Sequence, residues 1–597
     1  MNSNPSEEYK QRLTARRESV ERYKKFDRML NIVRLAAWFV FFAMLWMALR
    51  LDLIPVWMAL SPILIFLGIA IARSHIETRL RRAQRSVAFY ERGLARIEDR
   101  WMGGMGGAPS VTSAAENHLY AAALDIFGKD SLFELISTAR TRSGEEKLAK
   151  WLSAPAPTGE IRMRQQCVDE LRNNIDLREA LAVLGPEMRA TVHPELMTRW
   201  GLAPPVLQSP PARVIAPIIA VFVYYTEIDF WFVNGNIWPA IIALILAGAF
   251  GLHYRTRVRE VIESVEKPER ELEIISLVLA RLEREEFRSP RLRELRRTFD
   301  TNGRPPSKQI ARLIRRIDML NSRLNHAFTL LGNLMLWSTQ WTFAIEAWRR
   351  DCGAALEHWL DAIGEIEALC SLAGYAYEHP EDPFPEIVED RACFEGDELR
   401  HPLLPQNRSV PNTVRLGQDL QLLVVSGSNM SGKSTLLRTV GVNVALALAG
   451  APVRAKRFRL SPLAMGATLR VQDSLQDGTS QFYAEILRLR SIMELTEGPV
   501  AVLFLLDEIL HGTNSHDRAI GAEAVVKSLV ERGAIGLVTT HDLALAKVAD
   551  GLAPRAANVH FQDHLENGKM VFDYRLHPGV VQKSNALELM RAVGLKV

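Results

Sequence analysis

The sequence predicts an α/β domain with a mostly parallel sheet at the C-terminal end, preceded by an all-α region and by two apolar helical hairpins. Three short apolar runs, residues 420–425, 500–506 and 535–540, each end in polar residues and alternate with helical patterns, as parallel strands do. Residues 257–378 carry apolar residues at spacings of three and four, which indicates amphipathic helices. Residues 32–73 and 214–252 are two apolar blocks.

The composition of the whole chain bounds its class. With 597 residues, of which 48% are hydrophobic and 24% charged, the chain has room for roughly three or four domains. A net charge of +4 gives no argument for nucleic acid from charge alone. The cysteines lie far apart without a CxxC pair, which argues against a structural zinc site and against a disulfide framework; they are Cys167, Cys352, Cys370 and Cys393.

The two apolar blocks predict transmembrane helical hairpins. The first, residues 31–73, holds runs at 35–49 and 53–72, each near the roughly 20 residues that cross a bilayer. A basic tail, residues 1–30, precedes it and Arg73 to Arg85 follow it, so both ends are expected in the cytoplasm. The second hairpin, residues 213–254, has a shorter first run and is also flanked by arginines. We expect about four spans with the C-terminal domain in the cytoplasm. A hairpin buried in a soluble core is the alternative.

Four further ranges complete the predicted organisation. Residues 74–117 form a basic helix and a Gly-rich linker, residues 118–212 and 255–385 form two parts of a helical core, and residues 386–597 form the α/β domain. Residues 327–348 are apolar enough for a fifth span, but their polar residues favour a core helix. One apolar stripe is expected to pack: Ile310, Leu313, Ile317, Leu320, Leu324, Phe328 and Leu331. A group of basic residues either forms solvated helix faces or contacts phosphates: Arg288, Arg291, Arg293, Arg296, Arg297, Arg312, Arg315 and Arg316.

The most specific motif lies between the first strand of the α/β domain and the helix that follows it. Gly427, four further residues and then Gly432-Lys433-Ser434 match the GxxxxGK[ST] pattern of a P-loop in its required context. We expect Lys433 to reach the β- and γ-phosphates of ATP and Ser434 to hold Mg²⁺. The backbone of this loop is expected to surround the phosphates; its residues are Gly427, Ser428, Asn429, Met430, Ser431, Gly432, Lys433, Ser434 and Thr435.

Polar residues at two later strand ends complete the predicted chemistry. Asp507-Glu508, about 75 residues after the P-loop, has the form of a Walker B pair. Asp507 would coordinate Mg²⁺, and Glu508 would polarise the attacking water. His541 ends the next strand and is expected to sense the γ-phosphate. A lone strand-end carboxylate more often caps a helix and a lone histidine is more often a surface residue, so the prediction depends on their order. We expect Mg-dependent hydrolysis of ATP to ADP and phosphate, with Lys433, Glu508 and His541 as catalytic residues.

Together these motifs resemble those of the MutS DNA mismatch repair ATPases. The resemblance covers residues 118–205 and 256–597, and segments 131–155 and 358–376 are similar to the start and the final helix of the MutS core domain. Several short motifs carry it: Asn429-Met430, D-x4-G-x-S-x-F-x2-E at 473–485, Asp507-Glu508-Ile509, Gly512-Thr513 with Asp517, Thr539-Thr540-His541, Arg400-His401-Pro402, Val410-Pro411-Asn412 and Lys583-Ser584.

The resemblance implies an ABC-like ATPase that works as a homodimer with composite ATP sites. Ser480 would contact the γ-phosphate bound by the other subunit, and the core helices would act as levers. Departures from the usual family pattern at Gln481, His511, Asn514 and Arg518 put the coupling between sites in doubt more than ATP binding. The mismatch-reading and connector domains have no counterpart. Residues 89–91 match the family's Phe-x-Glu wedge as a string, but no domain surrounds them, so we expect no mismatch role for them.

The sequence thus predicts a membrane-anchored MutS-like ATPase, an ATP-driven dimeric clamp that acts on DNA of a mismatched, branched or damaged kind. The alternative is a membrane ATP switch that moves a protein partner without binding DNA. An ABC-type transporter is disfavoured, because the chain lacks an LSGGQ signature and offers only about four spans.

Overall fold

The chain folds into two compact units. The computed structural model describes residues 4–51, 55, 58, 61–102, 118–184, 194–207, 209–265, 269–300, 303–324, 326–389, 392–428, 430–469, 481–541, 543–566 and 569–581. Unit 1 comprises Met1–Ser137, Ala149–Val183 and Ser371–Val597, and unit 2 comprises Thr138–Leu148 and Leu184–Cys370. The seven residue ranges predicted from the sequence stay predictions.

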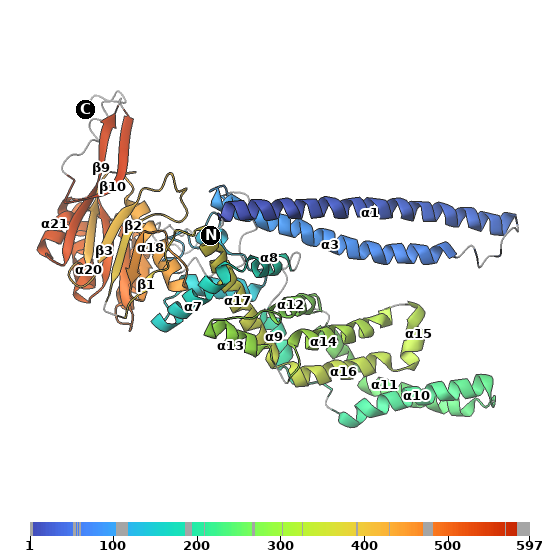
Figure 1. Ribbon diagram of the computed structural model, residues 1–597. Coiled ribbons are helices and arrows are strands. Elements are labelled where there is room, and N and C mark those ends of the chain that lie inside the picture. The colour runs from blue at the N-terminus through green and yellow to red at the C-terminus, as the bar shows by residue number, and fades with distance from the viewer. Residues whose placement is uncertain are drawn as a thin grey trace. The chain divides into compact units, whose positions relative to one another are not determined.

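Two long helices of unit 1, α1 (Pro5–Arg50) and α3 (Ser61–Ile97), lie side by side (Figure 1). The Asn4 side chain caps α1 by accepting a hydrogen bond from the backbone of Ser6 at 3.1 Å, which satisfies one of the free N–H groups of the first turn. Neither glycine nor a second proline interrupts α1 after Pro5. Both helices expose large apolar side chains in the halves nearer their connection, among them Leu35, Phe39, Trp46, Ile65 and Leu67.

The opposite ends of α1 and α3 are buried against α8 (Ile175–Val183) and the end of α17 (Ala355–Glu378). We call this contact the docking seam; its buried apolar residues are Tyr9, Leu13, Phe89, Tyr90, Leu94, Ile175 and Ala182. Within it the Tyr9 hydroxyl donates to Glu378 Oε1 at 3.3 Å, and Arg96 Nε donates to Glu378 Oε2 at 2.6 Å. Phe89 and Tyr90 of the Phe-x-Glu string therefore serve packing in this structure.

A six-stranded sheet forms the centre of the C-terminal α/β domain, in the order β10-β9-β4-β8-β7-β6. Its strands are β4 (Leu422–Ser426), β6 (Leu463–Ala467), β7 (Ala501–Asp507), β8 (Ile535–Thr540), β9 (Ala556–Glu566) and β10 (Lys569–Pro578). All neighbouring pairs are parallel except β9 and β10, which form an antiparallel hairpin. The predicted mostly parallel sheet and the predicted terminal hairpin are confirmed.

Helices and a smaller sheet surround these strands. The helices are α18 (Lys433–Ala449), α19 (Gln481–Leu495), α20 (Ser515–Glu531) and α21 (Leu543–Gly551). The second sheet has the order β1 (Glu386–Ile387), β5 (Arg457–Leu460), β2 (Phe394–Leu399) and β3 (Asn412–Leu416). Phe504, Leu506 and Val538 from the large sheet are buried with Val526 and Leu529 of α20, because both faces of a parallel sheet must be covered. Three short helices precede these elements, α5 (Leu132–Ile136), α6 (Arg142–Ser153) and α7 (Thr158–Arg172).

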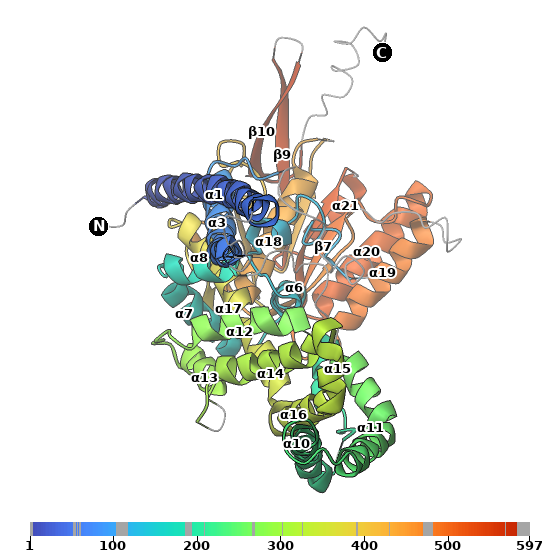
Figure 2. The ribbon, with the colours of Figure 1, turned by 90° about the vertical axis from the view of Figure 1, so that its right-hand side faces the viewer.

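Unit 2 is helical and carries the second apolar hairpin. Its helices are α9 (Pro194–Leu202), α10 (Pro210–Phe232), α11 (Trp238–Val265), α12 (Glu269–Leu282), α13 (Pro290–Thr298), α14 (Pro306–Asn321), α15 (His326–Leu334) and α16 (Trp337–Cys352). α10 and α11 pack on each other (Figure 2). α10 continues through Glu227 and Asp229 to Phe232, so the helix is longer than the first apolar run of this hairpin.

Two sequence predictions for unit 2 need correction. Ile310, Leu313, Ile317 and Leu320 are buried on α14 as predicted, but Leu324 is 68% exposed, because α14 ends at Asn321 and a 3₁₀ turn (Ser322–Leu324) follows. The core helix predicted over residues 327–348 is two helices, α15 and α16. Leu336 separates them with a left-handed backbone (φ 51°).

Three helices among the described residues are long and apolar enough to cross a membrane, by length and composition. They are the helices at Pro5–Arg50, Pro211–Phe232 and Trp238–Val265. The fourth predicted span, residues 53–72, begins in a stretch outside the described residues and stays a prediction.

Candidate active site

The loop between β4 and α18 needs glycine at two positions. Gly427 has φ 152°, and a Cβ there would approach Ser431 Oγ to 2.8 Å. Gly432 has φ 107° and stands immediately before the first residue of α18. The loop therefore turns back at the carboxyl end of β4 and places Lys433 in the first turn of the helix.

Lys433 lies inside this loop. Its side chain is almost completely buried, and Nζ donates to the carbonyl oxygens of Gly427 at 2.9 Å and Ser428 at 3.0 Å. The same Nζ is 3.4 Å from Glu508 Oε1. The ammonium group of Lys433 thus contacts both the loop backbone and Glu508 at the end of β7.

The two acidic residues at the end of β7 are fixed by β8, the adjacent strand. Asp507 pairs in register with Thr539, whose hydroxyl donates to Asp507 Oδ1. The Asp507 N–H donates to Thr468 Oγ1 at 3.1 Å, and the Glu508 N–H donates to Thr539 Oγ1 at 3.1 Å. Glu508 has a left-handed backbone (φ 46°), which is uncommon for glutamate and ends the strand at this point.

Glu508 lies between a lysine and two histidines. His541 Nδ1 is 3.5 Å from Oε1 of Glu508, and His511 Nε2 is 3.2 Å from Oε2. The two imidazole rings stack with centroids 5.0 Å apart. Partial burial opposes ionisation of Glu508, but the positive charges of Lys433 and His541 outweigh burial and lower the pKa of this carboxyl. Glu508 is therefore a carboxylate at neutral pH.

The side chains around the loop fit a polyphosphate and a hard cation. Ser431 Oγ is buried and has no hydrogen-bond partner among the residues that the structure describes, so a ligand could supply one. Ser434 and Thr435 expose their side chains at the N-terminal end of α18, where N–H groups favour anions. The oxygen ligands that Mg²⁺ prefers are present in Ser434 and Asp507. Ser428 donates from Oγ to Asp563 Oδ2 at 2.6 Å, which ties the loop to β9.

The structure brings most of the predicted site residues together around one strand-end edge. Lys433 Nζ and His541 Nδ1 lie 3.4 Å and 3.5 Å from Oε1 of Glu508, and the Thr539 hydroxyl donates to Asp507, the residue before Glu508. Met430 has φ 70° and is 84% exposed. Asn429, Ser480 and Lys583-Ser584 lie outside the described residues. Gln481, one of the departures from the family pattern, begins α19.

Two contacts were not predicted from the sequence. His511 appeared there only as a departure from the family pattern, yet it contacts Glu508 three residues earlier. The backbone bends between them, with Leu510 at φ 61° and its N–H donating to Glu485 Oε1 at 2.6 Å. The spacing of three residues between Glu508 and His511 is the one sequence feature that could have suggested this contact. No local pattern indicated the contact from Asp563 to Ser428.

Comparisons with known proteins find similarity in the part of the chain that holds these residues. Residues 423–596 match the family model of MutS domain V. A DNA mismatch repair protein MutS from Natronomonas pharaonis is 34% identical over 239 residues, which cover 39% of this chain and 27% of that protein. An Endonuclease MutS2 from Thermus thermophilus is 34% identical over 203 residues, covering 33% and 25% of the two chains. The chain spans about a quarter of the length of these curated relatives.

Proposed function

We propose that this chain is a membrane-anchored, MutS-like ATPase that hydrolyses ATP to ADP and phosphate with Mg²⁺, because residues 423–596 match the family model of MutS domain V. The observation that supports this most directly is the group formed by Lys433, Glu508 and His541 beside Asp507, at the edge where β4, β7 and β8 end. Nucleotides bind at this edge of parallel sheets in α/β domains.

Each side chain has a role that follows from its contacts. Lys433 exchanges its two carbonyl partners for phosphate oxygens, because an ammonium group gains more from a charged acceptor. Glu508, ionised and next to His541, accepts a hydrogen bond from the attacking water and orients it. His541 donates to the γ-phosphate. Mg²⁺ bound at Ser434 and Asp507 would neutralise charge on the phosphates.

We further propose that two copies of the chain close on shared nucleotide. Ser480 of the partner subunit would contact the γ-phosphate, as the family resemblance implies. The next helix, α19, exposes Tyr483, Ile486 and Leu487, an apolar face that suits a subunit contact. Closure of this kind would turn the state of the nucleotide into movement of the helical arms.

We propose that the dimer acts on DNA, because the relatives that match are named as a DNA mismatch repair protein and an endonuclease. Exposed apolar side chains on α1, α10 and α11 support the membrane anchor. They also support the second candidate, a membrane ATP switch that moves a protein partner without DNA.

One experiment separates the two candidates. The detergent-solubilised full chain is incubated with homoduplex, mismatched and branched DNA, with and without Mg-ATP, at several salt concentrations. A DNA clamp binds in a way that depends on nucleotide, and its affinity falls as salt rises. Lys433→Ala, which removes the P-loop ammonium, should abolish the nucleotide dependence. Absence of DNA binding in every state, with ATP hydrolysis intact, would support the protein-moving switch.

A further inference from the structure

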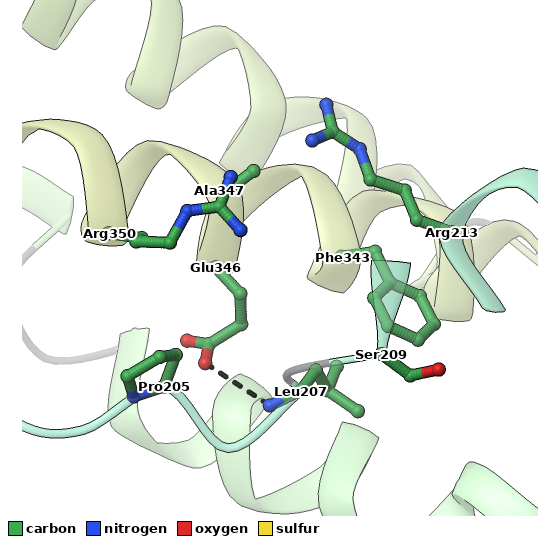
Figure 3. Close-up of a pocket in the computed structure, with 8 residues that line it drawn as sticks. All are labelled: Pro205, Leu207, Ser209, Arg213, Phe343, Glu346, Ala347 and Arg350. Atoms are coloured by element: carbon green, nitrogen blue, oxygen red, sulfur yellow. Dashed lines mark hydrogen bonds between the residues drawn. The ribbon is translucent and has the colours of Figure 1, made fainter. Parts of the chain in front are cut away.

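Unit 2 contains a pocket of about 350 Å³ beside the start of α10. Pockets that hold small ligands usually span roughly 300–1,000 Å³. Three elements line it: the chain between α9 and α10, the start of α10, and α16 (Figure 3). The lining residues are Pro205, Leu207, Ser209, Arg213, Phe343, Glu346, Ala347 and Arg350. No sequence motif pointed to this place, and the proposed ATPase chemistry does not use it.

The pocket is cationic. Arg213 and Arg350 both line it, and among the described residues Arg213 forms no ion pair and no side-chain hydrogen bond. The only carboxylate partner of Arg350 in the described part of the chain is Asp351, at 3.3 Å, and both side chains are more than half exposed, so this pair is weak. Arg316, partly buried nearby on α14, has its pKa lowered by burial and by the charges of Arg312 and Arg213. Positive charge therefore exceeds negative charge here, although Asp351 offsets part of it.

The one acidic residue in the lining, Glu346, is already neutralised. Its Oε2 accepts from Arg349 Nη2 at 2.9 Å and from the Val206 N–H at 2.7 Å. Its carboxylate also accepts from the Leu207 N–H, and in Figure 3 it is directed toward that backbone, whereas the guanidinium groups of Arg213 and Arg350 lie on the other side of the lining. The second oxygen, Oε1, is buried and has no hydrogen-bond partner in the described part of the chain. This wall therefore favours a ligand that offers a hydroxyl donor, directly or through a water.

The pocket lies beside the ends of α10 and α11 at which exposed apolar residues give way to arginines. On α10 the exposed apolar residues begin directly after Arg213, with Val214 and Ile215. On α11 they end at Leu252, and Tyr254 packs edge-on against Phe343 of the pocket, with ring centroids 5.5 Å apart. Three arginines follow on α11: Arg255, Arg257 and Arg259. Such a transition is typical of the cytoplasmic boundary of a bilayer, where anionic lipid headgroups gather around basic residues.

From this arrangement we propose that the pocket binds the phosphate of an anionic phospholipid headgroup that also carries hydroxyl groups, such as phosphatidylglycerol. Arg213 and Arg350 bind the phosphate, since guanidinium groups pair with phosphate oxygens through two parallel hydrogen bonds. The hydroxyl groups of the headgroup face the Glu346 wall. The acyl chains lie along the exposed apolar side of α10. This site goes beyond the proposed ATPase chemistry and rests only on the membrane anchoring.

The test uses the detergent-solubilised full chain, titrated calorimetrically with short-chain phosphatidylglycerol, short-chain phosphatidylcholine, inorganic phosphate or duplex DNA. We expect one saturable site for phosphatidylglycerol and none for phosphatidylcholine. The double variant Arg213→Gln/Arg350→Gln should weaken phosphatidylglycerol binding by at least roughly tenfold, because two charge-assisted hydrogen-bond donors are lost. The matched control Arg293→Gln/Arg297→Gln removes two exposed arginines of α13 and should leave binding unchanged.

Several outcomes would overturn the proposal. Equal weakening in the pocket and control variants would show that only net charge matters. Inorganic phosphate binding as tightly as the lipid would assign the site to a soluble anion, and selective loss of duplex DNA binding in the pocket variant would assign it to nucleic acid. The variant Arg213→Lys/Arg350→Lys keeps the charge but loses the paired hydrogen bonds, so it should bind the lipid more weakly than the unmodified chain and more tightly than the glutamine variant, which guards against a folding defect. ATP hydrolysis measured on the same samples is independent, so its absence in the unmodified chain would refute the proposed ATPase without touching the lipid site.

Discussion

Replacing Glu508 by glutamine separates nucleotide binding from turnover. The amide has the size of the carboxylate but cannot accept a proton from the attacking water. Lys433 keeps both of its hydrogen bonds to the loop carbonyls and loses only the ion pair at 3.4 Å, in which Glu508 is partly exposed. After solvent screening such a pair contributes about 1 kcal/mol or less, so the unfolding free energy should change little.

The kinetic cost should be much larger. A positioned general base contributes roughly 10²- to 10⁴-fold to a rate, which corresponds to about 3 to 5 kcal/mol of activation free energy. Glu508→Gln should therefore release phosphate from Mg-ATP at least about a hundredfold more slowly, while equilibrium binding of ATP stays within a few fold of the unmodified chain. Glu523→Gln is a matched control, because this carboxylate lies on α20 in an exposed pair with Lys527.

The measurements are steady-state phosphate release and ATP binding by fluorescence or calorimetry. Turnover at the normal rate in Glu508→Gln would remove Glu508 from the proposed mechanism. Loss of ATP binding together with turnover would show instead that Glu508 holds the loop in place through Lys433.

Three other changes test the structure more broadly. Glu378→Gln should lower the unfolding free energy by about 3 to 5 kcal/mol in thermal or denaturant unfolding, because Arg96 stays buried without its carboxylate; a change below about 1 kcal/mol would contradict the docking seam. Burial lowers the pKa of His379 to about 3, so the folded chain keeps this imidazole neutral where the unfolded chain protonates it. The free energy of unfolding should therefore fall by up to about 1.4 kcal/mol for each pH unit below about pH 6.5. His379→Asn should flatten that slope between about pH 6.5 and 4 in unfolding experiments. Gly536→Ala should destabilise the fold strongly or abolish folding, because a Cβ there would lie 2.2 Å from a backbone oxygen of β7. The control Gly551→Ala on α21 places a Cβ with nothing within 4 Å and should be neutral or stabilising. Thermal unfolding followed by circular dichroism compares the two variants.

Local sequence signals were sufficient for five of the six strands of the large sheet and for the position of the loop after β4, whereas β6 and the smaller sheet were not predicted. Short apolar runs ending in Gly427, Asp507 or His541 mark buried strands, and parallel strands bring such ends to one edge whatever the connections between them are. The expected strands, the mostly parallel sheet and the terminal hairpin followed from that pattern.

Contacts between distant parts of the chain carry no such signal. Tyr9 and Glu378 are separated by 369 positions, and nothing near either residue indicates the other. The break between α15 and α16 was missed because the residue with the left-handed backbone is Leu336 and not the glycine that usually marks such a position. Helical periodicity also continues on both sides of it. The contact of His511 with Glu508 depends on a turn at Leu510 that is held by Glu485, which a one-dimensional pattern does not show.

The uninterrupted α1 helix has a mechanical consequence. Its 46 residues, at about 1.5 Å each, make a rod of about 69 Å that is clamped at one end by Tyr9 and Leu13 and is apolar near the other. A tilt of the helix by one degree about its docked end would displace its other end by about 1 Å. Inserting a single residue between 21 and 30 would rotate the apolar end of α1 by about 100° relative to the docked end, so the length of this helix sets the direction in which its exposed apolar side chains face.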